Sequence, residues 1–86
     1  MNSPIGATAV RVGTDWHFSH AASGGAIIHI QVTHECLVDA LASDGTEESD
    51  RAALDAHWRR IIAIGEDKFN AGEQQPIVVK RADFQT

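Results

Sequence analysis

The sequence predicts an α+β fold of two layers, in which an antiparallel sheet of about four strands carries two helices on one face. Three observations support this prediction. Residues 7–32 contain three short stretches of alternating apolar and polar side chains, the period-two pattern of half-buried strands. Residues 34–71 show apolar residues spaced by three and four, which is typical of amphipathic helices. A last apolar stretch gives the order β-β-β-α-α-β, and 86 residues suffice for one domain, 1–86.

The first three strands are expected to form an antiparallel meander with one apolar and one mixed face. Directly opposed residues lie on the same side of a sheet, so the loops must let the apolar sets coincide. A three-residue first loop pairs Val12 with Trp16, and an odd-numbered loop around Ser23 pairs Phe18 with Ile28. The predicted apolar face, which both helices cover, comprises Val10, Val12, Trp16, Phe18, Ile28, Ile30 and Val32.

The mixed face of this sheet is predicted to stay uncovered. His17 lies opposite His29 there, in a segment (17–36) with four of the five histidines and the only cysteine. A structural zinc site needs four ligands and a catalytic one usually three. His17 and His29 are therefore the candidates for metal ligands, but we expect two solvated imidazoles, no metal site and no cofactor. The candidate interaction residues of this face are Arg11, His17, Ile27, His29 and Gln31.

Two helices are predicted between the third strand and the end of the chain. Thr33 is a suitable N-cap for a short helix over about 34–42. A longer helix begins at Ser49 or Asp50 and stops near Gly72. Gly65 interrupts its apolar stripe at a cost of about 1 kcal/mol against alanine, so we expect a close approach to the sheet or to the first helix there. The stripe comprises Leu54, Trp58, Ile61, Ile62, Gly65 and Phe69.

The last strand is expected within 74–80, where Pro76 is permitted at the strand start. Phe84 then folds back on the apolar layer. The sequence leaves open where this strand joins the sheet.

The loop between the helices is polar and acidic. Its carboxylates lack the regular alternation of a calcium-binding loop. We therefore expect a solvated loop whose charges complement the positive end of the second helix. The residues concerned are Asp44, Glu47, Glu48 and Asp50.

The overall charge and composition exclude several classes of function. The net charge of −5 repels phosphate backbones, so we expect no nucleic-acid partner. A single cysteine forms no internal disulfide. No apolar run approaches the roughly 20 residues of a membrane span, and the first ten residues do not resemble a signal peptide. We expect a soluble cytoplasmic protein without membrane contact.

Three stretches resemble one known family: IHIQVTHECLVDAL, ALDAHWRRIIAIGEDKFNAG and IVVKRADF. They are similar to the small bacterial family catalogued as domain of unknown function fourteen eighty-eight, over roughly residues 26–84. The resemblance implies an α+β fold and no activity or catalytic residues. The chain departs from the pattern at 57–58, where the family has a smaller polar pair, and the histidine cluster lies outside the pattern. The matching positions are Val32, Leu37, Leu41, Trp58, Arg60, Ile61, Phe69, Gly72, Asp83 and Phe84.

Three functions compete on these grounds. The leading hypothesis is a non-enzymatic interaction or regulatory module, with a symmetric homodimer through the sheet face or an edge. A metal- or pH-responsive binder using His17 and His29 is the alternative. A thiol-dependent enzyme using Cys36 is a further alternative, although His34 and Cys36 diverge on a helix and cannot act as a base–nucleophile pair.

Overall fold

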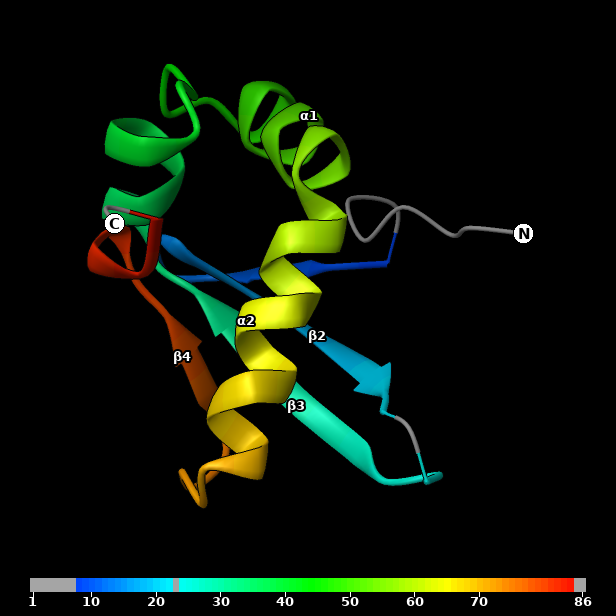
Figure 1. Ribbon diagram of the computed structural model, residues 1–86. Helices are drawn as coiled ribbons and strands as arrows, with labels where there is room; N and C mark the ends of the chain where they lie inside the picture. The colour runs from blue at the N-terminus through cyan, green and yellow to red at the C-terminus, as the bar shows by residue number, and fades with distance from the viewer. Residues whose placement is uncertain (1–7, 23, 85–86) are drawn as a thin grey trace.

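The computed structural model describes residues 8–22 and 24–84. They form the predicted α+β fold, a four-stranded sheet in the order β1–β2–β3–β4 with helices packed against it (Figure 1). The strands are β1 (Val10–Val12), β2 (Asp15–Ala21), β3 (Ile27–Val32) and β4 (Ile77–Val79). The helical segments are η2 (Cys36–Ala40), α1 (Glu47–Ala56), α2 (Trp58–Asn70) and η3 (Arg81–Phe84).

The first hairpin has a two-residue loop, and the predicted three-residue loop is wrong. β1 pairs antiparallel with β2, with Val10 opposite His17 and Val12 opposite Asp15. Gly13 has φ 66°, the positive φ that a two-residue hairpin turn favours at its first central position. The turn therefore decides the register, and both valines lie on the face opposite to the one predicted. The predicted start of this strand, residue 7, lies outside the described residues.

The second hairpin keeps every side chain on its predicted face but shifts the pairing by two residues. Phe18 lies opposite Ile30, and not opposite Ile28. Because side chains in a strand alternate with period two, an even shift leaves the faces unchanged. Trp16 and the apolar residues of β3 on the predicted face, Ile28, Ile30 and Val32, are accordingly buried. The predicted loop centre, residue 23, lies outside the described residues.

The fourth strand is parallel to β3 and lies beside it at the edge of the sheet, so the sheet is mixed and not wholly antiparallel. Ile30 pairs with Ile77 and Val32 with Val79. A parallel neighbour needs a crossover connection, which here is the helical segment between the two strands. Figure 1 shows α2 running from the end of β3 back towards its start, and β4 begins from there.

The short helix after β3 begins as predicted. The Thr33 hydroxyl accepts a hydrogen bond from the backbone N–H of Cys36 at 3.2 Å, which is the N-cap interaction expected of this residue. Over η2 the backbone forms a π-helix, which has more residues per turn than an α-helix. Cys36 and Leu37 on η2 are buried, so this segment closes one end of the core.

The predicted second helix is in fact two helices. The Thr46 hydroxyl caps α1 by accepting from the backbone N–H of Ser49 at 3.2 Å, so the helix starts earlier than expected. His57 leaves helical geometry with φ −118° and ψ 17° and separates α1 from α2. This break redirects the chain, so that α2 alone crosses the sheet (Figure 1).

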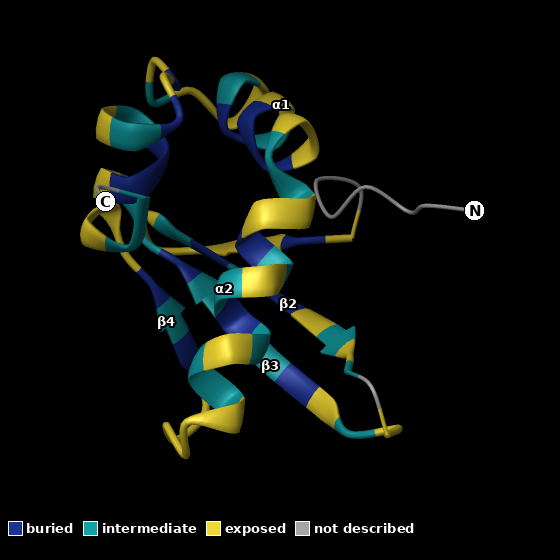
Figure 2. Ribbon diagram, viewed as in Figure 1, coloured by how far each residue is buried: buried dark blue, intermediate teal, exposed yellow. Residues whose placement is uncertain are grey.

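Gly65 makes the close approach that the sequence predicts. A Cβ atom on Gly65 would lie 2.6 Å from Cδ1 of Ile30, so any larger residue would force this end of the Ile30 side chain to move. Phe84 packs against the core from the end of the chain, as expected. Most of the buried positions lie on the strands and on parts of η2, α1 and α2 (Figure 2). They include Trp16, Ile28, Ile30, Val32, Leu37, Leu54, Ile61, Ile77 and Val79.

One carboxylate lies inside this core, contrary to the prediction of a solvated acidic loop. Asp50 on α1 is fully buried. Its Oδ2 accepts from the indole N–H of Trp16 at 3.0 Å, and its Oδ1 accepts from the hydroxyl of Ser43. A buried charge requires such hydrogen bonds because it has lost its hydration. The guanidinium of Arg51 lies over the Trp16 ring, 4.7 Å from its centroid.

Candidate functional site

The sheet side that faces away from the helices is the candidate site, and we call it the open face. It follows from the register, because residues opposite one another share a side. No helix of the described ranges packs on it (Figure 1). Val10, Val12 and Ile27 on this face are exposed, and Val78 is half-buried. Its strand residues are Val10, Val12, Asp15, His17, Ser19, Ala21, Ile27, His29, Gln31 and Val78.

Two imidazoles meet near the centre of the open face. Nδ1 of His17 lies 2.9 Å from Nε2 of His29, and the ring centroids are 5.1 Å apart. Because His29 lies opposite Ser19 and His17 opposite Gln31, the two rings are diagonal neighbours and not the directly opposed pair predicted. At this distance one ring N–H donates a hydrogen bond and the other ring nitrogen accepts it. The two nitrogens therefore face one another across the open face.

A hydrogen-bonded pair of side chains flanks the imidazoles. The side-chain amide of Gln31 donates to Oδ2 of Asp15 at 2.7 Å. The other carboxylate oxygen accepts from the backbone N–H of His34 at 2.9 Å. These two hydrogen bonds therefore fix the side chain of Asp15 at the start of β2. On the other side, the backbone N–H of His29 donates to Oε1 of Gln75 at 2.8 Å.

The rest of the open face is apolar and almost uncharged. Val10, Val12 and Ile27 are 61%, 57% and 64% exposed and are the exposed large hydrophobic residues of the described chain. All three lie on this one face. Asp15 is the one aspartate, glutamate, lysine or arginine among the strand residues of this face. The whole chain has 7 lysine and arginine residues and 12 aspartate and glutamate residues. Depletion of charge around exposed apolar residues is characteristic of the core of a protein interface.

Four of the five predicted interaction residues share the open face. His17, Ile27, His29 and Gln31 lie there as expected. Arg11 does not, because it lies opposite Trp16 and so on the covered side of the edge strand. Val10 and Val12 replace it. The two-residue turn at Gly13 is the sequence signal that could have found them.

The other histidines and the cysteine do not converge on the pair. Nε2 of His20 lies 2.7 Å from Oε2 of Glu66 on α2, which places it on the covered side. Within 8–22 and 24–84 no group of three or more histidine, cysteine, aspartate or glutamate side chains could hold a metal ion. Any metal at His17 and His29 would need its remaining ligands from elsewhere.

The thiol of Cys36 is poorly suited to catalysis. Burial, together with the charge of Asp83, raises its pKa to about 11. Because the thiolate is the nucleophile, a thiol with this pKa is almost wholly protonated and unreactive at neutral pH. Cys36 is therefore best described as a small buried residue on the core side of η2.

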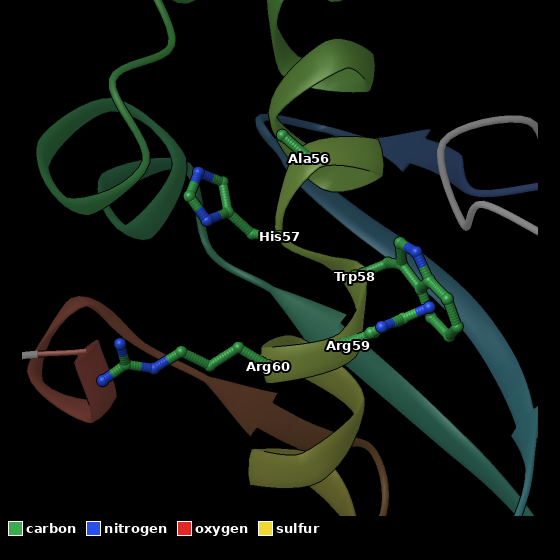
Figure 3. A pocket seen from close by; sticks show the side chains of 5 residues that line it. All are labelled: Ala56, His57, Trp58, Arg59 and Arg60. Carbon is green, nitrogen blue, oxygen red and sulfur yellow. The ribbon is translucent and has the colours of Figure 1, made fainter.

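A hollow of 410 Å³ lies at the junction of α1 and α2. Figure 3 shows that its side chains do not converge: His57 and Arg60 extend to one side of the helix, and Trp58 and Arg59 extend to the other. The guanidinium of Arg60 lies over the Phe84 ring, 5.0 Å from its centroid, and that of Arg59 lies over Trp58. These cations are held by aromatic rings, and the hollow offers no common point for an anion.

Comparisons with known proteins do not add a family to this description. No family model, curated protein or solved structure matches the chain. No helix in the described part of the chain is long and apolar enough to cross a membrane. The resemblance of residues 26–84 to an uncharacterised bacterial family stays a prediction, and the case for function depends on the open face.

Proposed function

We propose that this protein is a non-enzymatic interaction module whose open face binds a second copy of the same chain. The observation that carries the proposal is the gathering of Val10, Val12 and Ile27 on the one sheet face that no described helix covers. An antiparallel sheet that functions alone in water usually shows a polar outer face. Val10 and Val12 lie towards one end of this face and Ile27 towards the other, with His17 and His29 between them. Exposed apolar residues that share one uncovered face favour a surface that is covered in use.

Charge favours this face as the place where two copies meet. Each chain has a net charge of −5, so two chains repel one another over most of their surfaces. On the open face Asp15 is the one acidic strand residue, and its carboxylate already accepts two hydrogen bonds. Two open faces therefore approach with less repulsion than two helical surfaces. A symmetric pair would place the same residues on both sides of the interface.

The size of the open face indicates that the association is weak. At about 3.3 Å per residue and about 4.8 Å between strands, the strand residues cover roughly 300 Å². A stable interface buries about 800 Å² per partner. We therefore expect a dimer that depends on concentration, as a module that assembles and separates during its function would require.

A second candidate function, metal-responsive binding, is favoured by the 2.9 Å between the nitrogens of His17 and His29. We also propose that the chain is a member of the uncharacterised bacterial family, which the resemblance of residues 26–84 supports. A regulatory role and a cytoplasmic location are part of the same proposal and are supported by the composition of the sequence. Nucleic acid is disfavoured as the partner by the net charge of −5.

Sedimentation equilibrium of tag-free, metal-free protein between about 10 μM and about 1 mM tests the self-association. We expect the average mass to rise with concentration from 9.3 kDa towards twice that value. Val10→Glu should hold the mass at that of one chain, because it would bury a carboxylate against its own symmetric copy or an apolar neighbour.

The matched control is Ala63→Glu, which adds the same charge at an exposed position of α2. Ala63→Glu should associate like the parent protein. A mass of one chain at every concentration for the parent protein would refute the proposal, as would an equal loss of association in both variants.

A further inference from the structure

We propose that His17 and His29 are two ligands of a zinc ion, and that the same two residues of a second copy complete a four-imidazole site between the open faces. This inference rests on the proposed self-association for its second copy. Structural zinc sites are four-coordinate and tetrahedral, with imidazole among the preferred ligands. The arrangement supplies a chain-to-chain bridge that neither copy can form alone.

The spacing of the two nitrogens fits two ligands of one ion. With Zn–N bonds of about 2.0–2.1 Å at tetrahedral angles, two ligand nitrogens lie about 3.3 Å apart. Nδ1 of His17 and Nε2 of His29 are 2.9 Å apart. Rotation of the two rings would turn both lone pairs towards a common point beside the present nitrogen–nitrogen line and would open this distance by the few tenths of an ångström required.

The protons of the pair can be rearranged to suit the ion. In the metal-free pair, one of the two facing nitrogens carries a proton. A metal ion needs both lone pairs, so the ring proton of each neutral imidazole must lie on its other nitrogen. These are Nε2 of His17 and Nδ1 of His29. Among residues 8–22 and 24–84, no hydrogen bond to either outer nitrogen fixes the opposite tautomer.

A second copy supplies what the single chain lacks. The described residues of one chain bring no third histidine, cysteine or carboxylate to the pair. A two-fold axis through the ion would bring two further imidazoles to it and place the apolar residues of both faces around the site. The charge of +2 on the ion would also reduce the repulsion between two chains of −5 each.

The bridge also compensates for the small area of the open face. Roughly 300 Å² of strand surface is too little for a stable dimer. A ligand that binds only the assembled form stabilises it by mass action. Zinc would therefore convert a concentration-dependent pair into a stable one.

Isothermal titration with zinc chloride alone, paired with sedimentation equilibrium, tests the site. Tag-free protein is essential, because a polyhistidine tag would bind the ion itself. We expect one zinc per two chains and a mass of twice 9.3 kDa at concentrations where the metal-free protein is monomeric. His17→Ala and His29→Ala should each weaken zinc binding more than about tenfold and abolish the zinc-dependent change in mass.

His57→Ala is the matched control, because it removes one imidazole at the α1–α2 junction and should leave both readouts unchanged. Zinc bound one per chain without a change in mass would overturn the shared site. Zinc binding that is absent, or equal in the parent protein and His17→Ala, would overturn the inference altogether.

The metal-free concentration series separates this inference from the proposed function. Association without zinc, unchanged by zinc or by His17→Ala, would support the open face as a dimer interface and overturn the metal bridge. Zinc-dependent association that is lost in His17→Ala, with a metal-free protein that stays monomeric, would support the bridge and show that the face alone does not associate.

Discussion

The two faces of the one sheet differ in how they treat the same kinds of residue. On the covered face, the apolar side chains of β2 and β3 are fully or almost fully buried, and the polar groups beneath them are paired, as Asp50 is with Trp16. On the open face, valine and isoleucine are more than half exposed and two histidines face one another. The covered face is packed within the chain, whereas the open face leaves Val10, Val12 and Ile27 exposed.

This difference separates residues that stabilise the fold from residues that are free to serve an interaction. Substitutions on the covered face should therefore change the free energy of unfolding. Substitutions on the open face should change association and leave unfolding almost unaffected.

The largest expected contrast lies between two adjacent isoleucines of β3. Ile28 is fully buried and Ile27 is 64% exposed. Ile28→Ala should lower the free energy of unfolding by about 3–4 kcal/mol, because it leaves a cavity in the core. Ile27→Ala should change it by less than about 0.5 kcal/mol. Urea unfolding of dilute, metal-free monomers measures both, and equal losses would contradict the assignment of the two faces.

A smaller effect is expected from the buried carboxylate. Asp50→Ala leaves the indole N–H of Trp16 and the hydroxyl of Ser43 without their acceptor in the core. We expect a loss of about 2–3 kcal/mol, because each unsatisfied buried donor costs about 1–3 kcal/mol.

The control for that variant is Glu48→Ala, which removes an exposed carboxylate from the same helix and should have little effect on unfolding. Thermal unfolding followed by tryptophan fluorescence measures both variants. An equal loss of stability in Asp50→Ala and Glu48→Ala would contradict the prediction. It would show that Asp50 contributes only the favourable charge of an acidic residue near a helix start.

The smallest expected effect concerns the contact between α2 and the sheet. Gly65→Val places a side chain against Ile30, where a Cβ would already be 2.6 Å from Cδ1. Some of this overlap can be relieved, because Cδ1 is the end of a flexible side chain, so we expect a loss of about 1–2 kcal/mol.

Ala63→Val introduces the same residue at an exposed position of α2 and should cost only the lower helix propensity of valine, about 0.5 kcal/mol. Urea unfolding of both variants checks the comparison. A gain in stability for Gly65→Val would show that the helix has room at this position.

Much of the fold was predictable because it depends on short-range patterns. Alternation in β2 and β3 and the cap at Thr33 each involve residues close in sequence, and both agree with the structure. Gly65 was predictable because a glycine within an apolar helix stripe indicates a close approach, although its partner Ile30 is distant in sequence. The open face was predictable for the same reason, since an even shift in register does not exchange the two sides of a strand.

The predictions that failed depend on a balance between competing effects that the apolar pattern does not show. Burial of Val10 and Val12 favours a three-residue first loop, but the two-residue turn at Gly13 outweighs the burial of two residues on a short edge strand. The break at His57 and the burial of Asp50 likewise depend on what α1 packs against. From the sequence alone a carboxylate such as Asp50 is predicted to be solvated, because its buried hydrogen-bond donor, Trp16, lies far away in the chain.

The amino-acid sequence by itself determined the kinds and order of the elements, the apolar side of β2 and β3, and the presence of histidines on the other side. The spacing of apolar residues indicates which side of a strand or helix is buried, whatever other element of the chain packs against that side. Only the tertiary structure decided that β4 runs parallel beside β3, that Val10 and Val12 join the open face, and that the two imidazole nitrogens meet. The place of β4 depends on the path of the helical crossover, which is set by contacts between residues far apart in the chain. The place of the valines and the meeting of the imidazoles depend on strand register, which the apolar pattern alone does not fix.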